Sequence, residues 1–236
     1  MKKSSVVIII LVLIFTVFLG IKYLSESEKY LSADAIKFKE EYEKLNGEIN
    51  TSNSKKYPEV KISEDNVVKY SSYDEVLEIL QTGTGIIYLG FPECPWCRNL
   101  VPVLMTAANE TEIDVVYYLN IKEDRNLLVL DDNKKIKTQK EGSKNYFKLV
   151  DALSEILDDY VLTTNSGEEV NTKTKRIYLP LVIFVKEGKI IDYHLDTVES
   201  QENPYEPLSD RELEELLLTL INKISKTTGI ICDEHC

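Results

Sequence analysis

The chain has 236 residues, enough for one ordinary domain with additional segments. Hydrophobic residues make up 43% of it, which is sufficient for a packed core, and glycine and proline are too sparse for collagen-like or low-complexity sequence. The formal net charge of −12 argues against nucleic acid as the main partner, since phosphate binding requires a basic surface.

The first predicted element is a transmembrane helix within residues 1–24. Lys2 and Lys3 precede an uninterrupted apolar run at 6–21. At about 1.5 Å of rise per residue the run spans roughly 24 Å, slightly less than the roughly 30 Å of a bilayer core, and its flanks can fill the interfaces. Two lysines before the run and an acidic chain after it predict a single-pass membrane protein, with its domain on the extracellular face.

Two other interpretations of this segment stay open, a cleaved signal peptide and a buried core helix. A signal peptide requires a small-x-small cleavage site after its apolar core, and the end of the run at 18–22 has no clear site. The anchor and the signal peptide both place the following domain outside the cytosol, where disulfides persist.

Residues 25–57 are expected to form a stalk or a peripheral helix. They are charged and helix-prone, with a loose apolar stripe that includes Phe38 and Tyr42, and they end in a polar run. The compact domain is predicted to begin near Tyr57 and to occupy 58–229, and a cysteine-containing tail follows it.

The compact domain begins with alternating strands and helices. A short strand is expected at residues 67–70, and Ser72 and Glu75 have the spacing of a capping box that opens a helix. The elements expected next are a buried strand at 86–91, a helix from there to about residue 110 and an apolar strand at 115–121.

Residues 122–176 are a long insert that follows no simple sheet rhythm. Apolar spacing predicts a helix at 146–160, and residues 161–176 are expected to form a hairpin that turns near Gly167. The insert either shapes substrate choice or packs passively on the sheet edge.

After the insert, the pattern predicts a strand at residues 181–185, a turn, and a partner strand at 189–195. Ser209 and Glu212 form a second capping box, which opens a last helix to about residue 226. The order of elements predicts an α/β domain with a mixed central sheet flanked by helices.

A Cys-Pro-Trp-Cys sequence at residues 94–97 is the strongest chemical signal in the chain. Two residues between cysteines on the first turn of a helix bring the sulfurs within bonding reach, and the helix N-terminus favours a thiolate. The thiolate of Cys94 is expected to attack a substrate disulfide, and Cys97 is expected to resolve the mixed disulfide.

Together with two prolines and a glycine at characteristic positions, the cysteine pair makes the sequence resemble the thioredoxin family. Pro102 lies inside the helix that follows the cysteines, and Leu179-Pro180 precedes a strand and a turn at Gly188. The family's active-site helix carries a proline at that position, and its cis-proline precedes a strand and a glycine turn at that spacing. The resemblance covers residues 67–226 apart from the insert, and it implies a thioredoxin-like fold with a long insert before the cis-proline strand.

A closer resemblance rests on the segment Gly-Phe-Pro-Glu-Cys-Pro-Trp-Cys-Arg at 90–98. It is most similar to extracytoplasmic, membrane-anchored thioredoxin-like proteins of Gram-positive bacteria, a group that includes bacteriocin transport accessory proteins.

The resemblance implies a substrate-binding role for Leu179 and Pro180. A cis bond between them would lay this backbone beside Cys94, where it could pair with an incoming peptide like an added strand. The alternative is an ordinary proline at a strand edge. Pro95 and Trp96 are candidate substrate contacts, with a plain exposed aromatic side chain as the alternative for Trp96.

Tyr88 departs from the family pattern. Thioredoxin buries an aspartate six residues before its first cysteine, and Tyr88 stands at that position here. The usual proton acceptor for the deeper cysteine is therefore missing or replaced. This departure leaves the direction of exchange open among reductase, oxidase and isomerase.

The expected function is that of an extracytoplasmic protein thiol–disulfide oxidoreductase that needs no cofactor. Its partners are protein thiols or disulfides and an unknown redox partner. The alternative is a non-catalytic thioredoxin-fold module, an accessory for secretion or assembly whose disulfide is structural.

Cys232 and Cys236, in the tail at 230–236, are a candidate second redox pair that relays electrons to or from the first. A structural clip within the tail is the other interpretation. Zinc held by these cysteines and His235, alone or with the first pair, is the chemical alternative, but the prediction is that no metal is bound.

Three charged or titratable side chains near these motifs are expected to have no catalytic role. Glu93 and Arg98 flank the cysteine pair and are expected to be solvated charges, although Arg98 could also favour a nearby thiolate. His194 lies in a predicted hairpin strand and is expected to be a packed or surface histidine.

Overall fold

The structure is a computed structural model that describes residues 31–229. The predicted membrane helix, its cleavage, and the candidate pair of Cys232 and Cys236 lie outside these residues. Among the helices that are described, none is both long and apolar enough to cross a bilayer.

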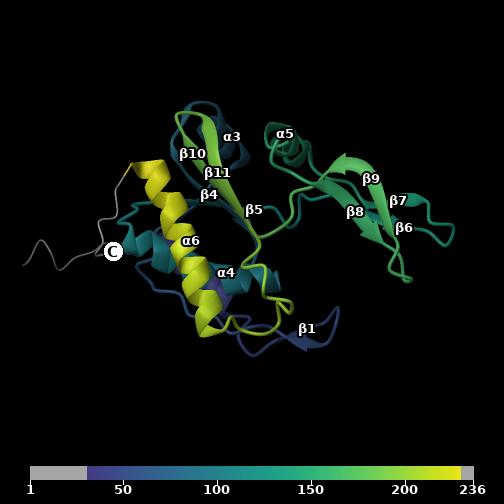
Figure 1. Cartoon of the computed structure of the whole chain (residues 1–236), viewed down its shortest axis with the longest axis horizontal. Helices are drawn as coiled ribbons and strands as arrows, with labels where there is room; N and C mark the ends of the chain where they lie inside the picture. Colours follow the sequence, from purple (N-terminus) through teal and green to yellow (C-terminus); the bar gives the residue numbers. More distant parts are fainter. Residues whose placement is uncertain (1–30, 230–236) are drawn as a thin grey trace, which may run out of the picture. The chain divides into compact units, whose positions relative to one another are not determined.

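A five-stranded mixed sheet forms the centre of the domain, in the strand order β11-β10-β4-β5-β3 (Figure 1). β3, β4 and β5 run parallel, whereas β10 pairs antiparallel with both β4 and β11. The prediction of an α/β domain with a mixed sheet is confirmed, and the topology is compatible with a thioredoxin-like fold. The strands are β3 (Val68–Tyr70), β4 (Gly85–Gly90), β5 (Val116–Asn120), β10 (Leu181–Lys186) and β11 (Lys189–Leu195).

β4 and β10 are the middle of the core. Nearly every residue of both strands is buried, which agrees with their continuous apolar sequence. β11 alternates between exposed and half-buried residues, as expected for an edge strand. Gly188 closes the β10–β11 turn at a φ of +71°, and a Cβ there would lie 2.1 Å from the Gln81 carbonyl oxygen, so the turn requires glycine.

Helices flank the sheet. α4 (Pro95–Glu110) packs against α6 (Asp210–Thr228), and α3 (Tyr73–Thr82) packs against α5 (Lys144–Ala152). Both predicted capping boxes are present, because Ser72 and Ser209 each accept a backbone hydrogen bond that a glutamate three residues later reciprocates.

The N-terminal helix α2 (Ala33–Glu43) is part of the core. Ala35, Phe38 and Tyr42 follow helical spacing and are completely buried. The sequence pattern predicts that the compact domain begins near Tyr57, but the structure brings this earlier helix into it. The segment between them holds a small ribbon of β1 (Ile49–Asn50) and β2 (Lys55–Lys56).

The insert consists of two hairpins with α5 between them. The predicted hairpin is present as β8 (Asp159–Thr163) and β9 (Glu169–Lys175), whereas the pattern gives no sign of the hairpin of β6 (Leu127–Leu130) and β7 (Ile136–Lys140). The helix predicted for 146–160 is too long. α5 ends at Ala152, but Leu153 and Leu157 are also buried in the segment that follows it. The apolar spacing therefore continues past the end of the helix.

Candidate redox site

The two cysteines lie at the start of α4, directly after β4. Cys94 is the N-cap residue, and its Sγ accepts a hydrogen bond of 3.2 Å from the Cys97 N–H. Pro95 occupies the first helical turn, where its missing N–H has no cost. Cys94 is 8% exposed and Cys97 is completely buried. The pair therefore has one cysteine near the surface and one behind it, as an attacking and a resolving cysteine require.

Leu179 and Pro180 lie beside the first cysteine. The peptide bond between them is cis, and the Leu179 carbonyl oxygen is 3.9 Å from Cys94 Sγ. The next residue, Leu181, pairs with Leu89 across β10 and β4. The end of β10 thus reaches the cysteine pair, which is the placement that the thioredoxin resemblance implies.

Trp96 is half-buried in the first turn of α4, not in a loop. Together with Leu179, it lines a groove at the same end of the sheet. The structure therefore brings together Cys94, Trp96 and Leu179, which the sequence named as attacking and substrate-contacting residues.

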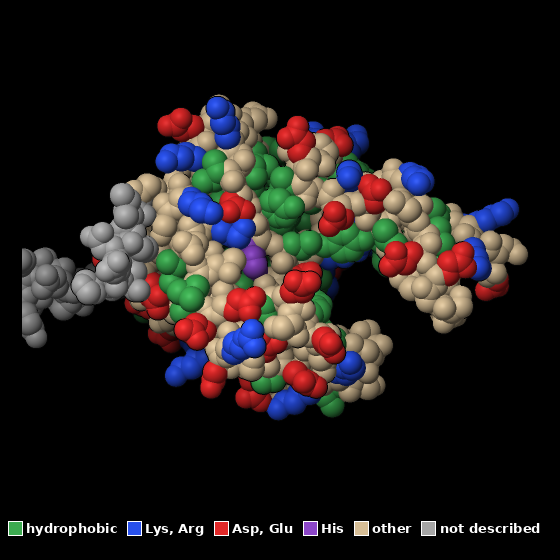
Figure 2. Space-filling view, viewed as in Figure 1, with side chains coloured by type: hydrophobic (Ala, Val, Ile, Leu, Met, Phe, Trp, Pro, Cys, Tyr) green, Lys and Arg blue, Asp and Glu red, His purple; other side chains and the backbone are tan. Residues whose placement is uncertain are grey.

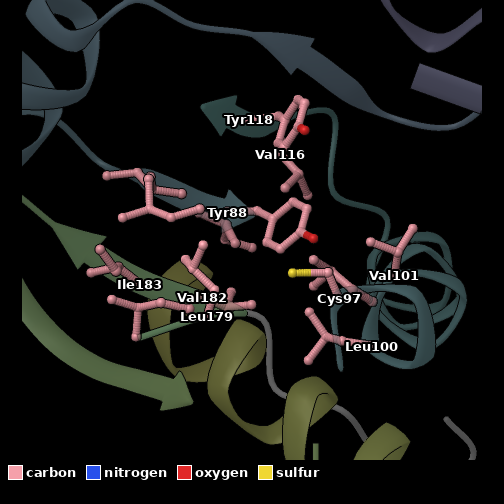
Figure 3. Packing of buried hydrophobic residues seen from close by; sticks show 14 of the residues in the cluster. Tyr88, Cys97, Leu100, Val101, Val116, Tyr118, Leu179, Val182 and Ile183 are labelled. Carbon is pink, nitrogen blue, oxygen red and sulfur yellow. The ribbon is translucent and has the colours of Figure 1, made fainter. Parts of the chain in front are cut away.

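A pair of tyrosines lies behind the deeper cysteine. Tyr88 on β4 is completely buried, and its hydroxyl points toward Cys97 (Figure 3). The Tyr42 hydroxyl, from α2, is 2.7 Å from the Tyr88 hydroxyl. Where thioredoxin has a carboxylate, this chain thus has a neutral hydroxyl that a second hydroxyl supports.

Gly90 makes room for this arrangement. A Cβ at position 90 would lie 2.3 Å from the Tyr88 hydroxyl oxygen and 2.5 Å from Cζ of the same ring. The ring is also held from the other side, where it stacks on Tyr118 with centroids 5.3 Å apart. Neither Gly90 nor Tyr42 is a candidate by sequence reasoning, because their partners come from the fold.

Burial raises the pKa of the Cys97 thiol well above its ordinary value, and the contact with Cys94 raises it further. Hydrogen bonds from Phe91 and Tyr88 act in the opposite direction, because they stabilise the thiolate. Burial also raises the pKa of Tyr88 and of Tyr42 well above the usual tyrosine range. Both phenols are therefore neutral at physiological pH.

Arg98 is completely buried, and the expectation of a solvated charge is wrong. The whole residue is 1% exposed. It donates to the carbonyl oxygens of Pro58 and Tyr42 and to Asn46 Oδ1, each at 2.7 Å. Because these acceptors come from α2 and the segment after it, Arg98 ties α4 to the N-terminal part of the domain.

The remaining candidates have structural contacts. Glu93 is half-buried and pairs with Lys122 at 2.9 Å. His194 Nε2 lies 2.9 Å from the Thr197 carbonyl oxygen, and burial lowers the pKa of this imidazole. It is a packed histidine, as expected.

The zinc alternative has no support in residues 31–229, which contain no cluster of metal-ligating side chains. Its tail ligands Cys232, His235 and Cys236 lie outside this range.

Comparison of the chain with models of protein families and with curated proteins finds no match to either.

Proposed function

We propose that this chain is a thioredoxin-like protein thiol–disulfide oxidoreductase. The observation that carries the proposal is the position of Cys94, at the N-cap of α4 with Sγ 3.9 Å from the Leu179 carbonyl oxygen and with Cys97 buried behind it. A peptide that pairs with the backbone beside Pro180 would bring its own sulfur to Cys94. The sequence pattern of residues 1–24, together with the resemblance of residues 90–98 to extracytoplasmic proteins of Gram-positive bacteria, extends the proposal to a domain held at the outer face of a bacterial cell membrane.

The exchange proceeds in two displacements. The Cys94 thiolate attacks a substrate disulfide, so that a bond forms between Cys94 and one substrate sulfur and the other substrate sulfur leaves as a thiolate. Cys97 then loses its proton and attacks Cys94 Sγ, which releases the second substrate thiolate and leaves a Cys94–Cys97 disulfide. Two electrons pass to the substrate, and the same steps in reverse oxidise a dithiol substrate. A redox partner protein restores the starting state.

The reduction potential of the first pair tests this function against the alternative of a non-catalytic module. The full-length chain would be equilibrated in dithiothreitol or glutathione buffers, and the state of Cys94 and Cys97 read by alkylation and mass spectrometry. We expect a potential between about −270 and −120 mV, the range of exchanging proteins. A value below about −300 mV would indicate a structural disulfide and contradict the proposal.

A Cys232→Ser/Cys236→Ser variant is the matched control. In this variant only Cys94 and Cys97 can form a disulfide. Comparison of its reduction potential with that of the parent chain shows whether the tail cysteines shift the potential of the first pair, as a relay would.

A further inference from the structure

A groove of about 470 Å³ lies beside the reactive cysteine. Its lining includes Trp96 and Leu179, which are close to Cys94, together with Asp159 and Val161 of the insert. Figure 2 shows hydrophobic side chains exposed where the β8–β9 hairpin joins the rest of the domain, with acidic side chains next to them.

Three aspartates line this groove: Asp158, Asp159 and Asp196. Asp159 is neutralised in part, because Lys175 Nζ lies 3.2 Å from its carboxylate and Asn171 donates to it. The carboxylates of Asp158 and Asp196 have no hydrogen bond or ion pair with any residue in 31–229. Partial burial raises the pKa of Asp196, so a cation beside this carboxylate would relieve an existing desolvation cost.

Arg176 and Lys175 are the basic residues next to this lining, and neither forms an ion pair with Asp158 or Asp196. The Arg176 guanidinium is buried and lies 3.8 Å from the ring centroid of Tyr160, and 5.9 Å from that of Tyr178, whose ring lines the groove. Lys175 is held by Asp159. The accessible lining therefore combines an apolar surface with two uncompensated carboxylates.

We infer that this groove binds a lysine or arginine side chain of the substrate protein, at a position next to the substrate cysteine. The inference rests on the proposed function, and it assigns the insert a role in substrate choice. Successive residues of an extended peptide are about 3.3 Å apart. A peptide whose sulfur meets Cys94 therefore places its neighbouring residues beside Leu179 and in the groove.

The lining matches both parts of such a side chain. The aliphatic stem of a lysine or arginine packs on Val161 and Leu179 while its charged end stays near water. The face of Trp96 or Tyr178 attracts the cation, and Asp158 and Asp196 complement its charge. An acidic side chain at the same position would meet like charge, so the groove also selects against it.

The test uses short peptides that differ only in whether lysine, glutamine or glutamate flanks a single cysteine. The cysteine is held as a mixed disulfide with a small neutral thiol, and its reaction with the reduced full-length chain is followed at two salt concentrations. We expect the lysine peptide to react about tenfold faster than the glutamate peptide at low salt, with a smaller ratio at high salt.

The variant Asp158→Asn/Asp196→Asn should reduce this preference to about twofold or less. Asparagine suits the positive φ of +62° at position 196, so the backbone there is preserved. The matched control is Glu214→Gln/Glu215→Gln on the exposed face of α6, which changes the net charge by the same amount. Equal loss of preference in both variants would mean general charge steering and would overturn the inference.

Binding without chemistry separates this inference from the proposed function. Trp96 is the single tryptophan of the chain and lines the groove, so its fluorescence reports occupancy by peptides in which serine replaces cysteine. If the lysine peptide binds more tightly than the glutamate peptide, and this difference is lost in Asp158→Asn/Asp196→Asn, the inference about the groove is supported even when no exchange occurs. Equal binding of the lysine and glutamate peptides overturns it even if exchange is fast.

Discussion

Replacement of Arg98 by methionine is expected to destabilise the domain by roughly 3 kcal/mol or more. Methionine fills part of the space but donates no hydrogen bond. The carbonyl oxygens of Pro58 and Tyr42 and the Asn46 Oδ1 would each lose a charged donor at 2.7 Å. Leaving a buried acceptor without a partner costs about 1–3 kcal/mol per group. The measurement is urea unfolding of reduced protein, compared with the parent chain.

Two further variants make this test specific. Arg211→Met removes an exposed arginine from the first turn of α6 and is expected to change the free energy of unfolding by less than about 0.5 kcal/mol. Arg98→Lys keeps the charge but loses the planar fork that reaches four acceptors, so it should recover only part of the stability. If Arg98→Met and Arg211→Met unfold at the same denaturant concentration, Arg98 does not hold α2 to α4 as described.

Replacement of Tyr88 by phenylalanine is expected to slow the resolving step about tenfold at neutral pH. The Tyr88 hydroxyl faces Cys97, and hydrogen bonding from it lowers the pKa of a thiol that burial raises. Its removal raises that pKa further, so less thiolate is present and the midpoint of the rate–pH profile moves to higher pH. Attack by Cys94 should keep its rate. The measurement is release of the second substrate thiol in single-turnover experiments across pH.

The tyrosine neighbours provide graded controls. Tyr42→Phe removes only the group that supports the Tyr88 hydroxyl, so a smaller shift in the same direction is expected. Tyr70→Phe removes a hydroxyl that donates to Glu41 in the same aromatic cluster, and it should leave the profile unchanged. An unshifted profile in Tyr88→Phe, or an equal shift in Tyr70→Phe, would show that the hydroxyl at position 88 does not assist Cys97.

The central sheet and the cysteine pair were predictable because their signals are local. β4 and β10 are continuous apolar runs, which are typical of strands buried on both faces. The capping boxes at Ser72 and Ser209 fix where two helices begin. The spacing of Cys94 and Cys97 is likewise local, whereas the placement of Pro180 beside Cys94 followed from the family resemblance.

The tyrosine pair and Arg98 were not predictable because their partners are distant in sequence. Tyr42 and Tyr88 are 46 residues apart, and the apolar stripe of α2 does not reveal which surface covers it. Three of the four acceptors of Arg98 are backbone carbonyls. Every residue carries such a group, so nothing in the sequence marks a buried guanidinium.

The first hairpin of the insert was not predictable for a different reason. β7 is exposed along most of its length, so its residues do not alternate between apolar and polar. Without a buried face, a strand has no sequence period to identify it.

Whether Cys94 attacks protein disulfides is decided by the covalent complex that Cys97→Ser forms with a disulfide-bonded protein such as insulin. In the Cys232→Ser/Cys236→Ser background, Cys94 is the only cysteine left in this variant. We expect peptide mapping to find a substrate sulfur bonded to Cys94, in a complex that dithiothreitol releases and that the additional change Cys94→Ser prevents. Failure to form the complex, while the parent chain folds and its pair can be oxidised, would contradict the role of Cys94 as the attacking residue.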